Sequence, residues 1–365
     1  MKPGISRLVF ALVLAVWVSP VWSQEAADAV QPEAAGAGQV AVSEATRASL
    51  ETKQAGRPVE AQNWMIVAAH PLAVEAGASV LGAGGSAADA FVAAQAVLGL
   101  VEPQSSGIGG GGFLVWYDAA SGNLTTLDGR ETAPLAATPR LFQNEAGVPL
   151  DFFEAVIGGR SVGVPGMPAL MEEAHRRWGR ANWPGLFEDA IRHAENGFRV
   201  SPRMAMMVAG DAERLARYAA TAGYFLAGTQ PLAENTLLKN PGYARAMRLL
   251  ARNGAAPFYT GEIAREIVRT VQSATGNPGT LDMLDFAIYR VKERPAVCGG
   301  YREFDVCGMG PPSSGALAVG QILGLLNSHD LAALGPDSAE AWRLIGEASR
   351  LAFADRGRFV ADSDF

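Results

Sequence analysis

The stretch from Ser86 to Val101 constrains the fold most, because a helix predicted there is apolar on nearly every side. Phe91, Leu98 and Val101 follow helical spacing, and alanines keep the remaining sides small. Ser86 and Asp89 form the Ser-x-x-Asp pattern that caps a helix start, and Pro103 ends the helix. Such a helix must be covered by neighbours on all sides, so the chain needs a layered core.

The patterns around this helix predict further helices and strands. A strand is expected from Met65, and a helix from Pro71 to the glycines near Gly85. The loop at Gly122 and Asn123 predicts a hairpin. Beyond it the sequence predicts a helical layer over about 150–275, strands over 297–309, and helices over 317–326 and 341–353. Together these patterns favour an α/β fold in which helices sandwich sheets.

The run from Gly107 to Gly112 satisfies the dinucleotide pattern G-x-G-x-x-G, but its context differs. A pyrophosphate-binding loop follows a strand and opens a helix, whereas this run follows a helix and opens a strand. We therefore expect the glycines to allow positive φ or close backbone approach. A mobile loop without function is an equally weighted alternative.

The first 23 residues read as a secretory signal peptide. Lys2 and Arg7 precede an apolar run over 8–18 that is too short to span a bilayer, and small residues precede Gln24. Removal of Lys2 and Arg7 with this segment changes 30 Lys and Arg to 28, against 37 Asp and Glu, a net charge of −9. We expect no nucleic-acid partner and no membrane association after cleavage. Residues 24–57 are poor in bulky side chains and predict a flexible leader.

The chain has two cysteines, Cys298 and Cys307. If Arg302 and Glu303 form a two-residue hairpin loop, the two cysteines lie opposite each other, and an exported protein would join them in a disulfide. The turn lacks the Gly or Asn that tight hairpins favour. Two cysteines without clustered histidines are a poor zinc site, so no metal is expected.

Three groups of residues are candidates for chemistry. Arg130 follows the predicted hairpin and could clamp a carboxylate with its guanidinium, although a surface ion pair with Asp128 or Glu131 is the more common role for such a residue. Ser313 and Ser314 lack the nucleophile elbow G-x-S-x-G and are expected to cap or turn the chain. The histidines are expected to be cap or surface residues, namely His70, His175, His193 and His329.

Eight short strings of residues indicate a family. Their order along nearly the whole mature chain resembles that of the γ-glutamyltransferase family. The strings are Ala69-His-Pro-Leu-Ala73, Gly84-Gly-Ser-Ala-Ala-Asp-Ala90, Gly109-Gly-Gly-Gly-Phe113, Asp128-Gly-Arg-Glu-Thr-Ala-Pro134, Val164-Pro-Gly166, Phe258-Tyr-Thr-Gly261, Pro311-Pro-Ser-Ser-Gly315 and Ala354-Asp-Arg356.

The resemblance implies an N-terminal-nucleophile hydrolase with a four-layer αββα sandwich, made as a precursor that cleaves itself before a Thr. It implies attack on γ-glutamyl amides such as glutathione, and transfer of the γ-glutamyl group to water or an amine through an acyl-enzyme. No cofactor is implied. The Arg that matches Arg130 binds the substrate's α-carboxylate in this family. Residues 58–365 would then be the large-subunit region of a periplasmic or secreted enzyme, partnered by the small subunit of the same precursor.

The family's cleavage site lies beyond the position that matches Phe365, so we expect no catalytic residue in this chain, an incomplete sandwich, and no activity of the chain alone. The pair Thr125-Thr126 is followed by Leu inside a predicted strand and does not fit the cleavage site. Two alternatives stay open. One is a related cephalosporin acylase or poly-γ-glutamate-processing homologue, and the other is a non-catalytic scaffold.

Overall fold

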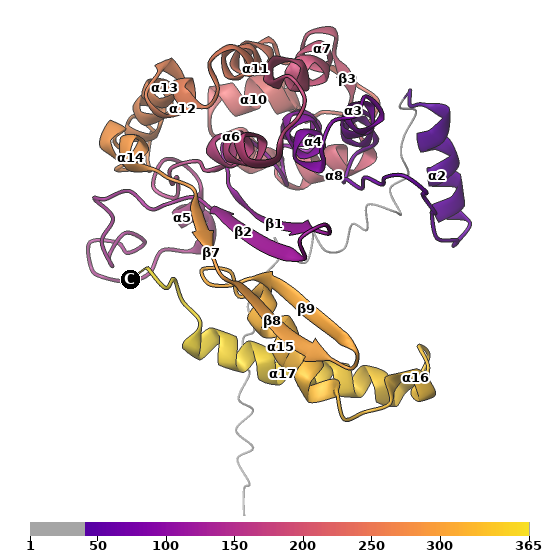
Figure 1. Cartoon of the computed structure of the whole chain (residues 1–365). Coiled ribbons are helices and arrows are strands. Elements are labelled where there is room, and N and C mark those ends of the chain that lie inside the picture. Colours follow the sequence, from indigo (N-terminus) through magenta and orange to yellow (C-terminus); the bar gives the residue numbers. More distant parts are fainter. Residues whose placement is uncertain (1–40, 365) are drawn as a thin grey trace, which may run out of the picture.

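A computed structural model describes residues 41–364, so the expected signal peptide lies outside the described residues. Figure 1 shows a large helical body above the strands β1 (Gly112–Asp118) and β2 (Asn123–Gly129). Below them, β8 (Ala296–Tyr301) and β9 (Phe304–Met309) lie against α15 (Gly315–Leu326) and α17 (Ala339–Phe359). The fold is a mixture of helices and sheets, as the sequence predicted.

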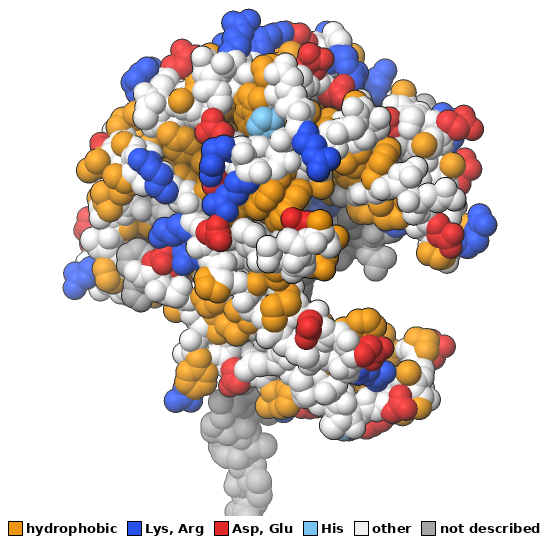
Figure 2. All heavy atoms as spheres, in the orientation of Figure 1, with side chains coloured by type: hydrophobic (Ala, Val, Ile, Leu, Met, Phe, Trp, Pro, Cys, Tyr) orange, Lys and Arg blue, Asp and Glu red, His pale blue; other side chains and the backbone are white. Residues whose placement is uncertain are grey.

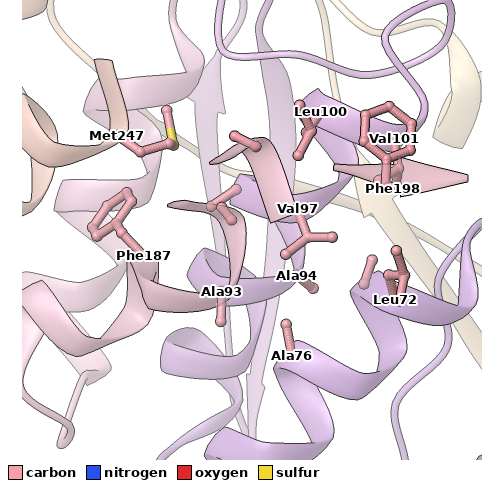
Figure 3. Close-up of a cluster of buried hydrophobic side chains, with 14 of the residues drawn as sticks. Leu72, Ala76, Ala93, Ala94, Val97, Leu100, Val101, Phe187, Phe198 and Met247 are labelled. Atoms are coloured by element: carbon pink, nitrogen blue, oxygen red, sulfur yellow. The ribbon is translucent and has the colours of Figure 1, made fainter. Parts of the chain in front are cut away.

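The helix predicted to be apolar on nearly every side is α4 (Ala87–Val101), and eleven of its fifteen residues are buried. It packs against α3 (Pro71–Gly82), α6 (Met167–Trp178), the 3₁₀-helix η1 (Trp183–Phe187) and α7 (Glu188–Asn196). Figure 3 shows Val97 and Leu100 of α4 among side chains of these and neighbouring elements, including Phe187 and Met247. The core of the helical body is built around α4.

Asp89 ties the start of α4 to the loop after α6. Its Oδ2 accepts the N–H and hydroxyl of Ser86, which completes the predicted capping box. The same oxygen accepts the N–H groups of Arg180 and Ala181, at 2.9 and 3.0 Å. Burial opposes ionisation of Asp89, but these hydrogen bonds outweigh it and lower its pKa.

The rest of the helical body is formed by short elements, most of them in the range where the sequence predicted a helical layer. They are α5 (Phe152–Val156), β3 (Phe198–Arg199), α8 (Pro202–Gly210), α9 (Ala212–Leu215), α10 (Ala219–Phe225), β4 (Leu226–Ala227), β5 (Gln230–Pro231), β6 (Leu237–Leu238), α11 (Pro241–Asn253), α12 (Ala256–Tyr259), α13 (Glu262–Gln272) and α14 (Met283–Ile288). β3 pairs with β6, and β4 pairs with β5.

The three-stranded sheet has the order β1-β2-β7, where β7 spans Lys292–Arg294. Both pairings are antiparallel. Gly112 lies opposite Gly129, and Asp128 lies opposite Lys292. α6 contacts β1 and β2, so the helical body covers this sheet.

The hairpin of β8 and β9 has the predicted register, with Tyr301 opposite Phe304 and Cys298 opposite Cys307. Cys298 and Cys307 are joined in a disulfide. Arg302 occupies the turn at φ 55°, where Gly or Asn is favoured, and its N–H donates to Asn327 Oδ1 at 3.0 Å. This tertiary hydrogen bond supports a turn that the local sequence disfavours.

The second pair of strands lies between the first sheet and the last helices. β9 contacts β1 and β8 contacts β2, while α15 packs against β8 and β9 on the other side. α17 packs on α15, and the short α16 (Leu331–Leu334) contacts α17. The contacts therefore run from helices to sheet, to hairpin, to helices.

Two predictions near the amino terminus differ from the structure. Residues 44–54 of the expected flexible leader form helix α2 (Glu44–Gln54), because Ser43 caps it and Glu75 of α3 accepts the hydroxyl of Ser43 at 2.7 Å. The strand expected from Met65 does not form. That segment has no assigned secondary structure; Ile66 packs against Gly77, but no strand among residues 41–364 pairs with it.

His70 makes the stability of the core depend on pH. Its Nδ1 accepts the N–H of Leu72 at the start of α3, and the residue is 2% exposed. Burial, and then the charge of His193, lowers the pKa of His70 from 6.5 to about 4. The unfolded chain therefore binds a proton below pH 6.5 that the folded chain binds only near pH 4. The contribution of His70 to the free energy of unfolding is fully present above pH 6.5 and is lost as the pH falls from 6.5 to about 4.

We predict that His70→Asn removes roughly 3 kcal/mol of the difference in unfolding free energy between pH 7 and pH 4, because Asn keeps a capping acceptor but does not titrate. Urea unfolding at the two pH values measures this difference. The exposed His329→Asn is the matched control and should leave it unchanged. A pH dependence in His70→Asn equal to that of the parent protein would contradict the prediction.

The disulfide closes a loop with a sequence separation of 9 residues. By the chain-entropy relation, a loop this short stabilises by about 2 to 3 kcal/mol. We predict that replacing both cysteines by Ser lowers the free energy of unfolding by that amount. Mass spectrometry of unreduced peptides gives the direct check, and finding both thiols free would refute the pairing.

Candidate functional site around Arg130

Arg130 lies directly after β2, and its backbone is held from both sides. Its N–H donates to Asp128 Oδ1, and its carbonyl accepts the hydroxyl of Tyr289; both distances are 2.9 Å. Burial, followed by the charges of Asp128 and Glu131, raises the pKa of Tyr289. The Tyr289 hydroxyl therefore stays a donor at neutral pH, and Arg130 has a fixed main-chain position.

The side chain of Arg130 points outward and is 57% exposed. Its Nε donates to Glu131 Oε2 at 2.9 Å, and the guanidinium lies 5.8 Å from the ring centroid of Phe113. Among residues 41–364, none hydrogen-bonds the two terminal guanidinium nitrogens. The ion pair with Glu131 considered from the sequence is thus present, yet the terminal nitrogens are still available to a ligand.

Two glycines allow three chain segments to meet behind Arg130. A Cβ on Gly111 would lie 2.5 Å from the carbonyl oxygen of Gly129, so only glycine fits that approach. A Cβ on Gly166 would overlap that same oxygen and the hydroxyl of Tyr289. The carbonyl of Gly110 accepts the N–H groups of Gly166 and Met167, at 2.9 and 3.0 Å. Close approach, rather than positive φ, explains Gly111 within this glycine run.

A pair of tyrosines supports the same place. Tyr259 donates its hydroxyl to the carbonyl of Pro165 at 2.8 Å and accepts the N–H of Ala169 at 3.2 Å. Its ring stacks on Tyr289, with centroids 5.4 Å apart. Four of the strings found in the sequence therefore converge at Arg130. They are the ones that begin at Gly109, Asp128, Val164 and Phe258.

Asp128 links Arg130 to a second arginine. Asp128 is 7% exposed, and its Oδ2 accepts Nε of Arg294 at 2.7 Å. The terminal nitrogens of Arg294 bind the Asp364 carboxylate at 3.0 and 2.5 Å, and Lys292 Nζ binds it at 2.6 Å. Hydrogen bonds from Arg294, and then from Lys292, lower the pKa of Asp364. Sequence reasoning did not single out Arg294, Lys292, Asp364 or Tyr289, and it named Tyr259 only as part of the string that begins at Phe258.

The serines of the Pro311 string lie in a separate cluster. Ser314 Oγ accepts Nε of Arg356 at 2.8 Å, and Ser313 Oγ accepts the N–H of Gly315. Ser314 thereby meets the Ala354-Asp-Arg356 string of α17. Ser313 thus takes the turn role expected from the sequence, whereas Ser314 occupies the N-cap position of α15 without a side-chain cap hydrogen bond.

The histidines also take structural positions. His70 caps α3, and His175 Nε2 lies 2.9 Å from the carbonyl of Ala181 and 3.5 Å from Asp89 Oδ1. The shorter contact is the hydrogen bond, because 3.5 Å is long for one. Within the described chain, no histidine hydrogen-bonds a serine or threonine hydroxyl.

The described residues show no arrangement typical of a metal site or a membrane anchor. Between residues 41 and 364, no three His, Cys, Asp or Glu side chains gather closely enough to hold a metal ion. No helix in that range has the length and apolar character needed to cross a bilayer. On the face drawn in Figure 2, Lys and Arg side chains lie among Asp and Glu side chains.

Comparisons with known proteins point to one family. The family model described as Gamma-glutamyltranspeptidase matches residues 73–365. The glutathione hydrolase proenzyme of Bacillus subtilis (strain 168) is 37% identical over 82% of this chain and 51% of its own length. The Acylase ACY 1 proenzyme of Pseudomonas sp. (strain V22) is 36% identical over 85% of this chain and 56% of its own length. The chain spans about half the length of these curated relatives.

A solved structure agrees with these matches. The crystal structure of Helicobacter pylori gamma-glutamyltranspeptidase superimposes with a TM-score of 0.80 and 35% identity. The match covers 84% of this chain and 87% of that chain.

The close approach at Gly166 makes a prediction about stability. Gly166→Ala should lower the free energy of unfolding by about 3 kcal/mol, because the methyl group overlaps backbone and the Tyr289 hydroxyl in a packed site. Gly223→Ala is the matched control, since its Cβ meets open space in α10 and should stabilise by roughly 0.5 to 1 kcal/mol. Chemical denaturation measures both. A loss below about 1 kcal/mol for Gly166→Ala would show that the segments separate easily.

Proposed function

Since the chain belongs to the gamma-glutamyltranspeptidase family, we propose that Arg130 binds the α-carboxylate of a γ-glutamyl donor in an enzyme that cleaves γ-glutamyl amides. The observation that carries the proposal is a guanidinium whose terminal nitrogens have no partner among the described residues, on a backbone held by Asp128 and Tyr289. Glutathione and related γ-glutamyl compounds are the proposed substrates.

The geometry of Arg130 suits a carboxylate. Glu131 takes Nε, so the two terminal nitrogens present a planar fork that matches the two oxygens of a carboxylate. The exposed ion pair with Glu131 contributes little stability, so its reorganisation on ligand binding costs little. Phe113 beside the guanidinium limits the directions from which a ligand can approach.

The proposed chemistry is acyl transfer through a side-chain nucleophile. The nucleophile attacks the γ-carbonyl carbon, the amide C–N bond breaks, and the leaving amine takes a proton. Water or an acceptor amine then cleaves the acyl-enzyme. This scheme needs no metal or organic cofactor.

Neither threonine of the Thr125-Thr126 pair is suited to act as the nucleophile. Both lie within β2, and Thr126 is buried and donates its hydroxyl to the carbonyl of Arg294 at 2.5 Å. We propose that the nucleophilic Thr belongs to the half of the relatives that this chain does not span. The chain would then be the large-subunit region of a precursor, without activity of its own. The word proenzyme in the relatives' names supports a precursor.

The arrangement of layers supports the finer fold proposed with this function. The observed order of helices, sheet, hairpin and helices would become the four-layer αββα sandwich of an N-terminal-nucleophile hydrolase when further strands extend both sheets. The proposed location is the periplasm or the exterior of the cell. Conditions there are oxidising, so a disulfide between Cys298 and Cys307 can persist.

A second candidate activity is that of an acylase, because an Acylase ACY 1 proenzyme is 36% identical to this chain, against 37% for the glutathione hydrolase proenzyme. An amide such as a glutaryl amide also carries a terminal carboxylate that Arg130 could bind. Hydrolysis of γ-glutamyl p-nitroanilide against glutaryl p-nitroanilide separates the two activities. Faster release from the glutaryl compound would favour the acylase.

We predict that Arg130→Lys raises KM for the γ-glutamyl donor in the enzyme expressed from the complete gene. Loss of one charge-assisted hydrogen bond should reduce kcat/KM roughly tenfold to a hundredfold, since an ammonium cannot bind both oxygens in the plane of the fork. Arg176→Lys, an exposed and equally conservative change in α6, is the control. Unchanged kinetics in Arg130→Lys would reduce Arg130 to a surface ion pair.

A further inference from the structure

We infer that Arg294 is a positioning residue for Arg130, and that Asp364 and Lys292 hold Arg294 in place. The inference rests on the proposed function of Arg130 as the carboxylate-binding residue. It concerns a different set of side chains, which approach Arg130 from β7 and from the segment after α17. Arg294 acts through Asp128 and does not itself touch the ligand.

The contacts form one continuous chain. Asp128 uses Oδ1 for the N–H of Arg130 and Oδ2 for Nε of Arg294, so both of its oxygens are occupied and its orientation is fixed. Arg294 faces Thr126 across the sheet, and the Thr126 hydroxyl binds the Arg294 carbonyl. The side chain of Arg294 is 13% exposed, which gives this network a largely desolvated centre.

Asp364 prevents the Arg294 guanidinium from turning away. It accepts both terminal nitrogens of Arg294 while Lys292 binds one of the same oxygens. The network therefore contains two cations, Arg294 and Lys292, and two carboxylates, Asp128 and Asp364. A fork with three donors in one plane makes both links at once, which a lysine ammonium cannot reproduce.

Charge compensation explains why this network matters for Arg130. Asp128 is two residues from Arg130, and Arg294 forms its ion pair, so without Arg294 the Asp128 carboxylate would be an uncompensated charge close in sequence to Arg130. Such a carboxylate would draw the terminal nitrogens of Arg130 toward itself and compete with the ligand's carboxylate. With Arg294 in place, the charge of Asp128 is balanced by the Arg294 guanidinium, and its contact with Arg130 is the hydrogen bond from the backbone N–H.

The test compares donor substrates with and without the α-carboxylate, in the enzyme expressed from the complete gene. Arg294→Lys should raise KM for γ-glutamyl p-nitroanilide roughly tenfold and leave kcat within about twofold. For 4-aminobutyryl p-nitroanilide, which lacks the α-carboxylate, kcat/KM should not change. Asp364→Asn should act in the same direction with a smaller effect, because Arg294 keeps its bond to Asp128.

The matched control is Glu293→Gln. Glu293 lies on the same strand, between Lys292 and Arg294, but pairs with Arg177 of α6 at 2.5 Å. Its loss removes an ion pair of the sheet without touching the Asp128 network. KM for both substrates should therefore remain at the parent value.

The outcomes separate this inference from the proposed function. If Arg130→Lys raises KM and Arg294→Lys does not, Arg294 does not position Arg130, while the role of Arg130 stands. If Arg294→Lys lowers kcat/KM equally for both substrates, its role is general support of the sheet and the inference fails. If neither variant changes KM, the proposed function fails and the inference with it. Should Arg294→Lys not fold, Asp364→Asn decides on the same criteria.

Discussion

A helix that is apolar on every side must be covered on every side, and α4 imposes this constraint on the whole molecule. α3, α6, α7 and η1 surround it, and its first turn is held to the loop after α6 by the buried Asp89. Since β1 begins eleven residues after the last residue of α4, the position of α4 also places the glycine run. The short segment between α4 and β1 thus fixes the position of the sheet relative to the core.

Close approach between backbone segments determines where Arg130 lies. The glycines at 111 and 166 let the end of β2 lie against two other segments, and hydrogen bonds from Asp128 and Tyr289 then fix the main chain of Arg130. The guanidinium itself is left exposed. A rigid backbone with an exposed, planar cationic group is the arrangement expected of a residue that recognises carboxylates.

Much of the architecture could be predicted from local patterns. The capping box of Ser86 and Asp89, the hairpin of β1 and β2, and the register that places Cys298 opposite Cys307 each depend on residues close in sequence. α2 was not foreseen, because its support comes from Glu75, 32 residues away from Ser43. A strand at Met65 was wrongly predicted, since a local apolar run does not supply the partner strand that pairing requires.

The site was predictable only in part, because the residues that support it lie far from it in the sequence. Arg130 emerged from the family resemblance, while local reasoning favoured an ion pair. Its supports come from far along the chain: Tyr289 is 159 residues from Arg130, and Arg294 is 166 residues from Asp128. Neither has a local pattern that signals its role.

The most direct test is a crystal structure of the enzyme from the complete gene with bound glutamate. The account predicts the α-carboxylate within about 2.7 to 2.9 Å of both terminal nitrogens of Arg130, with Asp128 still between Arg130 and Arg294. A carboxylate bound elsewhere, with Arg130 paired only to Glu131, would contradict it.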